Sequence, residues 1–242
     1  MDKILVLNPM RAGGDFFKDY FADWEDIDVM SLDQGARILA SRVDIALAGF
    51  DSVKKAREAE KAGYKAIILT CHDDPNLFSL REAVRIPVLG VGQTTWHFCS
   101  MLASRFSIIS PREIYEKHAK EDLAARYGFG EKLISVRLIP FEQPLGEVGQ
   151  LSRQRPIPEN LVQLTMNTCI KAIEEDGAPA ITFGCAYLAM IIEEVDVRLK
   201  AKGYNATLIK PFPLTVEVAR LLIRMKLSHS EKAFPLANPT AE

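Results

Sequence analysis

The stretch GYKAIILTC at residues 63–71 returns in the second half of the chain as GAPAITFGC at residues 177–185. Both stretches fit the pattern G-x-x-A-I-x-x-x-C, and a charged segment of helical character precedes each glycine. Glycine commonly ends a helix because it adopts a positive φ, and a short apolar run after it is typical of a buried strand. Each copy therefore predicts a helix, a buried strand, and a cysteine at the strand's carboxyl end, Cys71 or Cys185.

The position of the two cysteines suggests a ligand site. In open sheets of parallel strands, ligands bind at the carboxyl ends of the strands. An internal repeat that places a thiol there twice predicts one site with two sulfur atoms, supplied by two similar lobes.

The rest of the chain alternates strand and helix patterns and restarts midway. Apolar runs at residues 4–7 and 106–109 each end in a small polar residue and a proline, Asn8-Pro9 and Ser110-Pro111. Unbroken apolar strands between helices indicate parallel sheets that are covered by helices on both faces. We therefore expect an α/β fold of two pseudo-symmetric lobes, divided near Phe106.

Composition narrows the class of protein. The chain has 242 residues, 48% of them hydrophobic, which is enough for a large core. A net charge of −2 offers no basic face, so no nucleic acid is expected as a partner. The apolar run at 4–7 is too short for a signal peptide, and the uncharged run at 178–192 is too short to span a membrane. We expect a soluble, cytoplasmic protein that makes no membrane contact and whose four cysteines stay reduced.

Several motifs together resemble one known family. The run Cys71-His72-Asp73-Asp74-Pro75-Asn76-Leu77 resembles the Cys-x-x-Asp-Pro-Gly-Leu signature of hydantoin and allantoin racemases. Further similarity lies in ILVLNP at residues 4–9, in the spacing of glycine, leucine, serine and aspartate over residues 35–44, and in Gly184-Cys185-Ala186. With these matches the chain is identified as a member of the aspartate/glutamate/hydantoin racemase superfamily.

The resemblance implies two α/β lobes, each a four-stranded parallel sheet flanked by helices, with the active site in the interlobe cleft and a C-terminal helix that returns to the first lobe. We assign residues 1–97 and 212–242 to lobe 1, which carries Cys71, and residues 98–211 to lobe 2, which carries Cys185. We further expect a small-molecule substrate, no cofactor and a homo-oligomer. No metal is expected, because the adjacent side chains of His72, Asp73 and Asp74 diverge and no matching ligand set appears elsewhere.

Two thiols can invert a carbon that carries an acidic proton. One base removes the proton from one face while an acid on the other face returns one. A thiol titrates near ~8.5, so a modest shift makes one cysteine a thiolate and leaves the other a neutral acid near pH 7. Both cysteines are expected just before a helix, whose N-terminal N–H groups stabilise a thiolate and an enolate-like oxygen. Cys71 and Cys185 are therefore the candidate catalytic residues.

The candidate substrate-binding residues surround these positions. Asn8 and Ser110 end the first strand of each lobe, where they either contact a thiol or a substrate oxygen or serve as turn residues before proline. Hydantoin-type members carry Asn-Pro-Asn and a hydroxyl residue where this chain has Met10 and Ile38, which indicates a less polar pocket. The full candidate set is Asn8, Met10, Ile38, Thr70, His72, Ser110, Gly184 and Ala186.

The favoured function is racemisation or epimerisation by 1,1-proton transfer at a carbon next to a carbonyl, with hydantoins or related ureides as substrates. Within the superfamily the alternatives are an aspartate/glutamate-type amino-acid racemase, a maleate cis-trans isomerase and an arylmalonate decarboxylase. A two-lobed ligand-binding sensor without chemistry is the non-enzymatic alternative.

Other segments have simpler interpretations. Cys99 and Cys169 lie inside helical patterns and are expected in the core. Asp74 precedes a proline and is expected to cap a helix that begins at residue 75. Residues 140–158 are rich in proline, lack periodicity and predict a long loop that acts as a lid. The tail after Leu227 is expected to fray.

Overall fold

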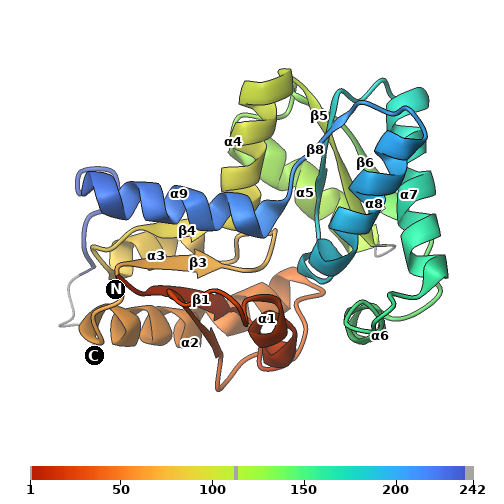
Figure 1. The fold of residues 1–242 in the computed structure, drawn as a ribbon. Helices are drawn as coiled ribbons and strands as arrows, with labels where there is room; N and C mark the ends of the chain where they lie inside the picture. Colours follow the sequence, from red (N-terminus) through yellow and green to blue (C-terminus); the bar gives the residue numbers. More distant parts are fainter. Residues whose placement is uncertain (1, 112–113, 238–242) are drawn as a thin grey trace. The chain divides into compact units, whose positions relative to one another are not determined.

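The computed structural model describes residues 2–111 and 114–237 and divides the chain into two compact units (Figure 1). Unit 1 comprises Met1–Val91 and Thr215–Glu242, and unit 2 comprises Gly92–Leu214. The domain bounds expected from the sequence, 1–97 with 212–242 and 98–211, differ from these by a few residues and stay a prediction.

Each unit is built on one four-stranded sheet, and every strand pair is parallel. The sheet of unit 1 has the order β2-β1-β3-β4, with β1 (Ile4–Asn8), β2 (Ile27–Ser31), β3 (Ala66–Leu69) and β4 (Val88–Gly90). The sheet of unit 2 has the order β6-β5-β7-β8, with β5 (Phe106–Pro111), β6 (Leu133–Ile139), β7 (Ala180–Phe183) and β8 (Thr207–Leu208). The two orders are equivalent, so the predicted duplication and the two four-stranded parallel sheets are confirmed.

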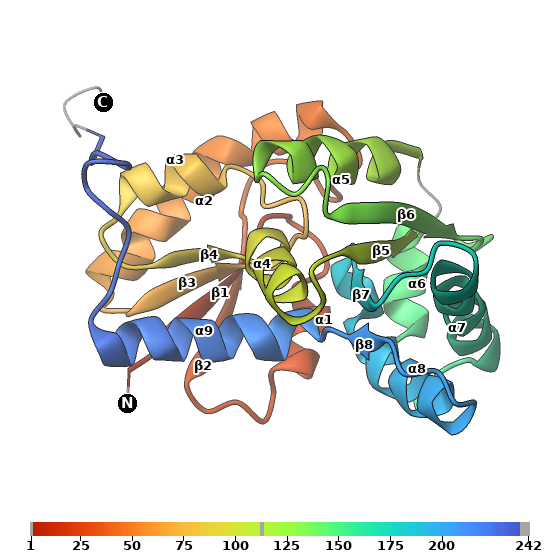
Figure 2. The same ribbon diagram turned by 90° about the horizontal axis from the view of Figure 1, so that it is seen from above.

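Helices cover both faces of each sheet. In unit 1, α9 lies on one face, with α2 and α3 on the other (Figures 1 and 2). Here α2 spans Arg42–Lys61, α3 Leu77–Ala83 and α9 Pro211–Met225, and α1 (Gly14–Tyr20) follows β1. In unit 2, α4 (Val91–Ala103) and α5 (Ile114–Arg126) lie on one face, with α7 (Glu159–Glu174) and α8 (Ala189–Ala201) on the other (Figure 1).

The interior strands are buried along their whole length. Every residue of β1, β3, β5 and β7 is buried, which explains why these segments read as unbroken apolar runs rather than as alternating ones. In unit 2 the largest buried side chain is Trp96 on α4, whose ring lies 6.3 Å from that of Phe106 and 6.4 Å from that of Phe129. This aromatic cluster packs α4 against the face of the second sheet that α5 also covers.

The prediction of a patternless loop over residues 140–158 is wrong. The segment contains a short helix, α6 (Leu145–Leu151), and buries Val148 and Ser152. It contacts η1, the 3₁₀ helix Ala186–Leu188 that follows Cys185, because Gly149 leaves room for the Tyr187 ring. The sequence pattern did not predict α6 because few of its residues are buried and prolines lie on both sides of it.

The tail after α9 does not fray within the described residues; residues 238–242 lie outside them. The Val88 N–H donates to Nε2 of His229 at 2.8 Å, and the Val88 carbonyl accepts from Nε of Arg81 at 3.1 Å. The Phe234 ring packs 5.6 Å from the His229 ring and 5.4 Å from the Arg81 guanidinium. Because β4 is an edge strand, the tail supplies a hydrogen-bond partner that a further strand would otherwise supply.

This contact makes stability depend on pH. Burial and, to a lesser degree, the positive charge of Arg81 together lower the pKa of His229 to about 4. Between about pH 6.5 and pH 4 the unfolded chain therefore binds a proton that the folded chain does not, so the free energy of unfolding falls as the pH falls. Urea unfolding at pH 7 and pH 5 should show that His229→Gln loses about 1 to 2 kcal/mol less than the wild type.

The matched control is a variant of the exposed His118, His118→Gln, which should follow the wild type. An equal loss of stability in the wild type and in His229→Gln would contradict the role of the His229–Val88 contact.

Candidate active site

The repeated strand ends come from the same pairing in both sheets. In unit 1, Leu7 of β1 pairs with Leu69 of β3, and the Thr70 N–H donates to the Leu7 carbonyl at 3.2 Å. Asn8 therefore ends β1, Thr70 directly follows the end of the neighbouring β3, and Cys71 comes next.

Unit 2 repeats this geometry. Ile109 of β5 pairs with Phe183 of β7, and the Gly184 N–H donates to the Ile109 carbonyl at 2.8 Å. Ser110 and Gly184 thus take the places of Asn8 and Thr70, and Cys185 takes that of Cys71. The sheet register explains why the sequence repeat marks the position of both thiols.

Asn8 is held by the turn that follows it. Its Nδ2 donates to the Ala12 carbonyl at 2.8 Å and to Oγ of Ser31 at 3.0 Å, whereas its Oδ1 is buried with no hydrogen-bond partner among the described residues. The turn interpretation therefore holds for the amide nitrogen, and the oxygen is left as an acceptor. Oγ1 of Thr70 on the next strand is likewise buried without such a partner. Unsatisfied buried polar atoms cost about 1–3 kcal/mol each, and they are common where a ligand or a water completes the site.

Met10 and Ile38 lie on two loops that are tied together at the same edge. The Leu32 N–H donates to the Met10 carbonyl at 3.2 Å, and the Arg11 N–H donates to the Ala36 carbonyl at 3.1 Å. Met10 is buried and Ile38 is half-buried. The structure therefore brings the loops after β1 and β2 to the edge that carries Asn8 and Thr70.

Cys71 is half-buried and does not directly precede a helix. A turn follows it, in which the Asp74 N–H donates to the Cys71 carbonyl at 3.1 Å, and α3 begins only at Leu77. The prediction that a helix begins directly after Cys71 is therefore wrong. Its neighbour His72 is buried.

Asp74 does not cap a helix with its side chain, contrary to the sequence prediction. The residue before α3 is Asn76, in the left-handed conformation, and Asp74 itself has a φ of 46°. The Asp74 carboxyl group is buried against Gly90, where an added Cβ would lie only 2.4 Å from it. The sequence Asp-Pro therefore marks a tight turn here, which packs the segment after Cys71 onto the end of β4.

Cys185 has a different setting. It is 9% exposed and precedes η1 directly, with the Leu188 N–H donating to the Cys185 carbonyl at 3.2 Å, and η1 leads straight into α8. The expected helix thus follows at once in unit 2 only. Ala186, the first residue of η1, is buried beside it.

One residue near this edge was not predicted from the sequence. Lys120 on α5 is only 1% exposed, and a Cβ atom added to Gly184 would lie 2.9 Å from its Cε and 2.7 Å from Oγ of Ser110. Leu123 and Ala124, three and four residues later on the same helix, are buried as well. Helical spacing to those two residues was the signal that could have found it.

The other two cysteines are packing residues. Burial raises the pKa of Cys99 and of Cys169 to about 12, so both stay protonated near pH 7. None of the four cysteines, all of which the structure describes, is in a disulfide bond. Within residues 2–111 and 114–237 we find no group of three His, Cys, Asp or Glu side chains placed to hold a metal ion. In that same part of the chain, no helix has the length and apolar character to cross a membrane.

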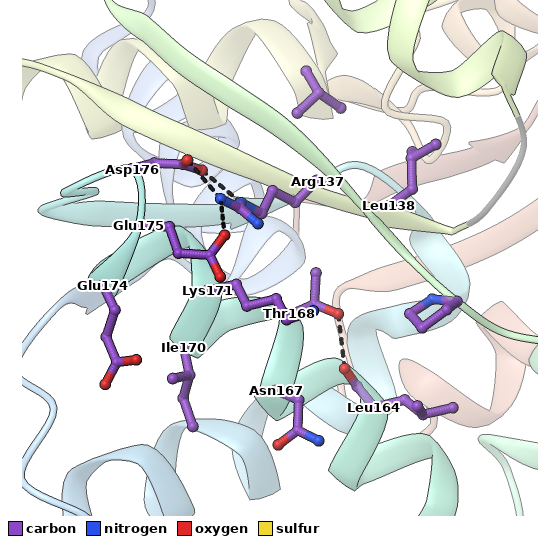
Figure 3. A pocket seen from close by; sticks show the side chains of 12 residues that line it. Arg137, Leu138, Leu164, Asn167, Thr168, Ile170, Lys171, Glu174, Glu175 and Asp176 are labelled. Atoms are coloured by element: carbon purple, nitrogen blue, oxygen red, sulfur yellow. Dashed lines mark hydrogen bonds and ion pairs between the residues drawn. The ribbon is translucent and has the colours of Figure 1, made fainter.

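A pocket of about 840 Å³ lies between β6 and α7 and contains none of the predicted site residues (Figure 3). Its main charged group, Arg137, is already engaged: it donates two hydrogen bonds of 2.6 Å to Asp176 and lies 2.7 Å from Glu175. These bonds hold the pKa of the Asp176 carboxyl group below its usual value. The pocket is therefore lined by a structural ion-pair network.

Known proteins match nearly the whole chain. Residues 17–219 match the Asp/Glu/Hydantoin racemase family. A hydantoin racemase of Paenarthrobacter aurescens is 27% identical over 245 residues, covering 98% of both chains. A hydantoin racemase of Pseudomonas sp. strain NS671 is 31% identical over 61% of this chain, an alignment that spans 55% of that protein's length.

A solved structure matches the fold. The allantoin racemase from Klebsiella pneumoniae superposes with a TM-score of 0.82 at 21% identity, covering 98% of this chain and 95% of that one. The match therefore confirms the predicted racemase-type fold. Because the family match covers most of the chain, the chain belongs to the Asp/Glu/Hydantoin racemase family, which confirms, at the level of the family, the prediction of an isomerase of the racemase type.

Proposed function

We propose that this chain is a cofactor-independent racemase or epimerase in which Cys71 and Cys185 act on opposite faces of a carbon next to a carbonyl. The observation that carries the proposal is the equivalent placement of the two thiols, each two residues beyond the end of the third strand of its sheet. A binding module has no need to duplicate a thiol at two strand ends, whereas proton transfer at two faces of a carbon needs a base on one face and an acid on the other, which a thiolate and a thiol can supply.

The reaction requires the substrate carbon between the two sulfur atoms. A thiolate takes the proton: the C–H bond breaks, its electron pair enters an enolate, and an S–H bond forms. The opposite thiol then gives its proton to the other face, which restores the C–H bond with inverted configuration and leaves that sulfur as the thiolate. Backbone N–H groups near the strand ends stabilise the enolate oxygen as it forms.

Cyclic ureides, such as hydantoins, are the favoured substrates. The Asn8 amide nitrogen is engaged, so Oδ1 is the atom left to meet a substrate, and it accepts a hydrogen bond from an N–H group. A hydantoin ring presents both N–H and C=O groups, and the hydroxyl of Thr70 can serve either. The buried Met10 and half-buried Ile38 fit an apolar substituent on the ring. The similarity to proteins named hydantoin racemase supports this choice.

The remaining predicted residues have subordinate roles in the proposal. Ser110 corresponds to Asn8 in the second sheet and would contact a substrate carbonyl from that side. Gly184 and Ala186 flank Cys185 with little bulk, and His72 shields Cys71 from water.

A substrate panel in deuterated buffer tests the reaction. Enantiopure 5-substituted hydantoins should lose optical rotation and gain one deuterium at C5 per inversion, because the returned proton comes from a thiol that exchanges with solvent. Enantiopure aspartate and glutamate should stay unchanged over the same time. Polarimetry and proton NMR read both results. Turnover of the amino acids alone would favour the amino-acid racemase, and no exchange with any substrate would favour the ligand-binding sensor.

Single cysteine variants test the two roles separately. Cys71→Ser and Cys185→Ser should each slow racemisation by at least about 100-fold, since a hydroxyl group is too weak an acid to replace the thiol. Each variant should still exchange the α-proton of one enantiomer, and the two should prefer opposite enantiomers in NMR exchange experiments.

Cys99→Ala and Cys169→Ala are the matched controls and should racemise at the wild-type rate, because both of these thiols lie in the core. The two-thiol mechanism fails should either serine variant racemise as fast as the wild type, or should both exchange the same enantiomer.

A further inference from the structure

Unit 2 contains a buried lysine, Lys120, to which the proposed reaction assigns no role. Lys120 reaches from the middle of α5 to the carboxyl edge of the second sheet, where its Cε lies 2.9 Å from the position that a Cβ on Gly184 would occupy. Oγ of Ser110 and Cγ2 of Ile108 border the same position at 2.7 and 3.0 Å. Only glycine at position 184 leaves this space to the lysine stem. Lysine is rarely fully buried, and Lys120 lies beside Gly184, the residue that precedes Cys185.

We propose that Lys120 is a positioning residue for Cys185: its buried ammonium ion holds the Cys185 sulfur as the thiolate in the resting protein, while Cys71 rests as the thiol. The proposal deepens the proposed function, on which it rests, because it assigns the resting base and the resting acid of the two-thiol pair.

The distance is short enough for a direct electrostatic effect. Standard bond lengths place the Lys120 ammonium within about 10 Å of the Cys185 Cα and within about 13 Å of its sulfur. At such a separation, with an effective dielectric constant of about 20, one positive charge favours an anion by about one pKa unit. The effect acts through space, so it requires no contact between the ammonium and the sulfur.

Burial alone would raise the pKa of a thiol and so disfavour the thiolate. Cys99 and Cys169, which lie in the same unit, are buried among uncharged groups, and burial raises their pKa to about 12. Cys185 is nearly as buried at 9% exposure. A thiolate at Cys185 therefore needs a positive charge nearby, and Lys120 supplies it.

The equivalent place in unit 1 has no such charge. There Thr70 stands where unit 2 has Gly184, and α1 follows β1 as α5 follows β5. The buried residues of α1 are Phe16 and Phe17, and its lysine, Lys18, is exposed. The two sheets share their topology, but only the second receives a buried cation from the helix after its first strand.

Among the residues that the structure describes, the other charged groups on the elements around Cys185 face solvent or are ion-paired. η1 contacts α6 and α8, and Ser110 and Gly184 contact α5. Asp196, the one other buried charge on these helices among the described residues, pairs with Lys200 at 2.8 Å. The remaining described groups are Lys117, His118, Glu121, Asp122 and Arg126 on α5, Glu147 on α6, and Glu193, Glu194 and Arg198 on α8.

A titration of the thiols tests the proposal without any substrate. In protein labelled with ¹³C at cysteine Cβ, the chemical shift reports ionisation of each thiol, and the spectrum of Cys185→Ser assigns the Cys185 signal. The wild-type Cys185 signal should titrate below about 8.5, and Cys99 and Cys169 should stay protonated throughout. Lys120→Met should raise the Cys185 midpoint by about one unit or more, Lys120→Arg should keep it near the wild-type value, and the exposed Lys117→Met should leave it unchanged.

A wild-type midpoint at or above about 8.5 overturns the proposal, as does an unchanged midpoint in folded Lys120→Met. Should Lys120→Met fail to fold, Lys120→Gln replaces it with a polar tip of similar reach; should both fail, the wild-type midpoint decides alone. The result is separable from the proposed function. A low Cys185 midpoint that rises in Lys120→Met supports this proposal even if no substrate is racemised. If a substrate is racemised but the Cys185 midpoint does not depend on Lys120, only this proposal is overturned.

Discussion

The parallel pairing of each thiol-bearing strand with the first strand of its sheet is the constraint on which the site depends. Leu69 pairs with Leu7, and Phe183 pairs with Ile109, so each cysteine emerges two residues beyond the last paired position. A slip of one residue would exchange the faces of every side chain in the strand. Because β3 and β7 are interior strands that are buried on both faces, such a slip would place Thr70 or Thr182 in the wrong layer of the core. Core packing thereby fixes the position of the thiols.

The same burial explains what the sequence could predict. Strands that are covered on both faces leave an unbroken apolar run, and the glycine before each run marks the end of a helix, so β3, β7 and their cysteines were predicted from pattern alone. The parallel direction of the strands followed from the alternation of elements, and their number in each sheet followed from the family resemblance. Many residues contribute to each of these features, so the sequence pattern predicts them even where single positions deviate.

The errors arose where a few residues decide the structure. Asp74-Pro75 has the composition of a helix start, yet the buried contact of Asp74 with Gly90 makes it a turn, and no local pattern records a contact with β4. α6 is held mainly by Val148 and Ser152 among prolines, too few for a visible period. Lys120 was not predicted from the sequence, although its spacing to the buried Leu123 and Ala124 places it on one helical stripe with them. Each of these depends on a tertiary contact rather than on local preference.

Duplication supplies two equivalent edges, whereas the proposed resting state, with one thiolate and one thiol, assigns them different roles. The differences lie in residues that touch the strand ends rather than in the strands themselves. In the first sheet, Asn8 and Thr70 present uncharged polar atoms, with Cys71 followed by a turn. In the second, the absence of a side chain at Gly184 admits Lys120, with Cys185 followed directly by η1. A side chain at position 184 would displace either Ser110 or Lys120, so the glycine, the hydroxyl and the lysine stem depend on one another. Symmetry of the sheets thus fixes where the thiols stand, and the residues that differ between the two strand ends give the thiols different chemical surroundings.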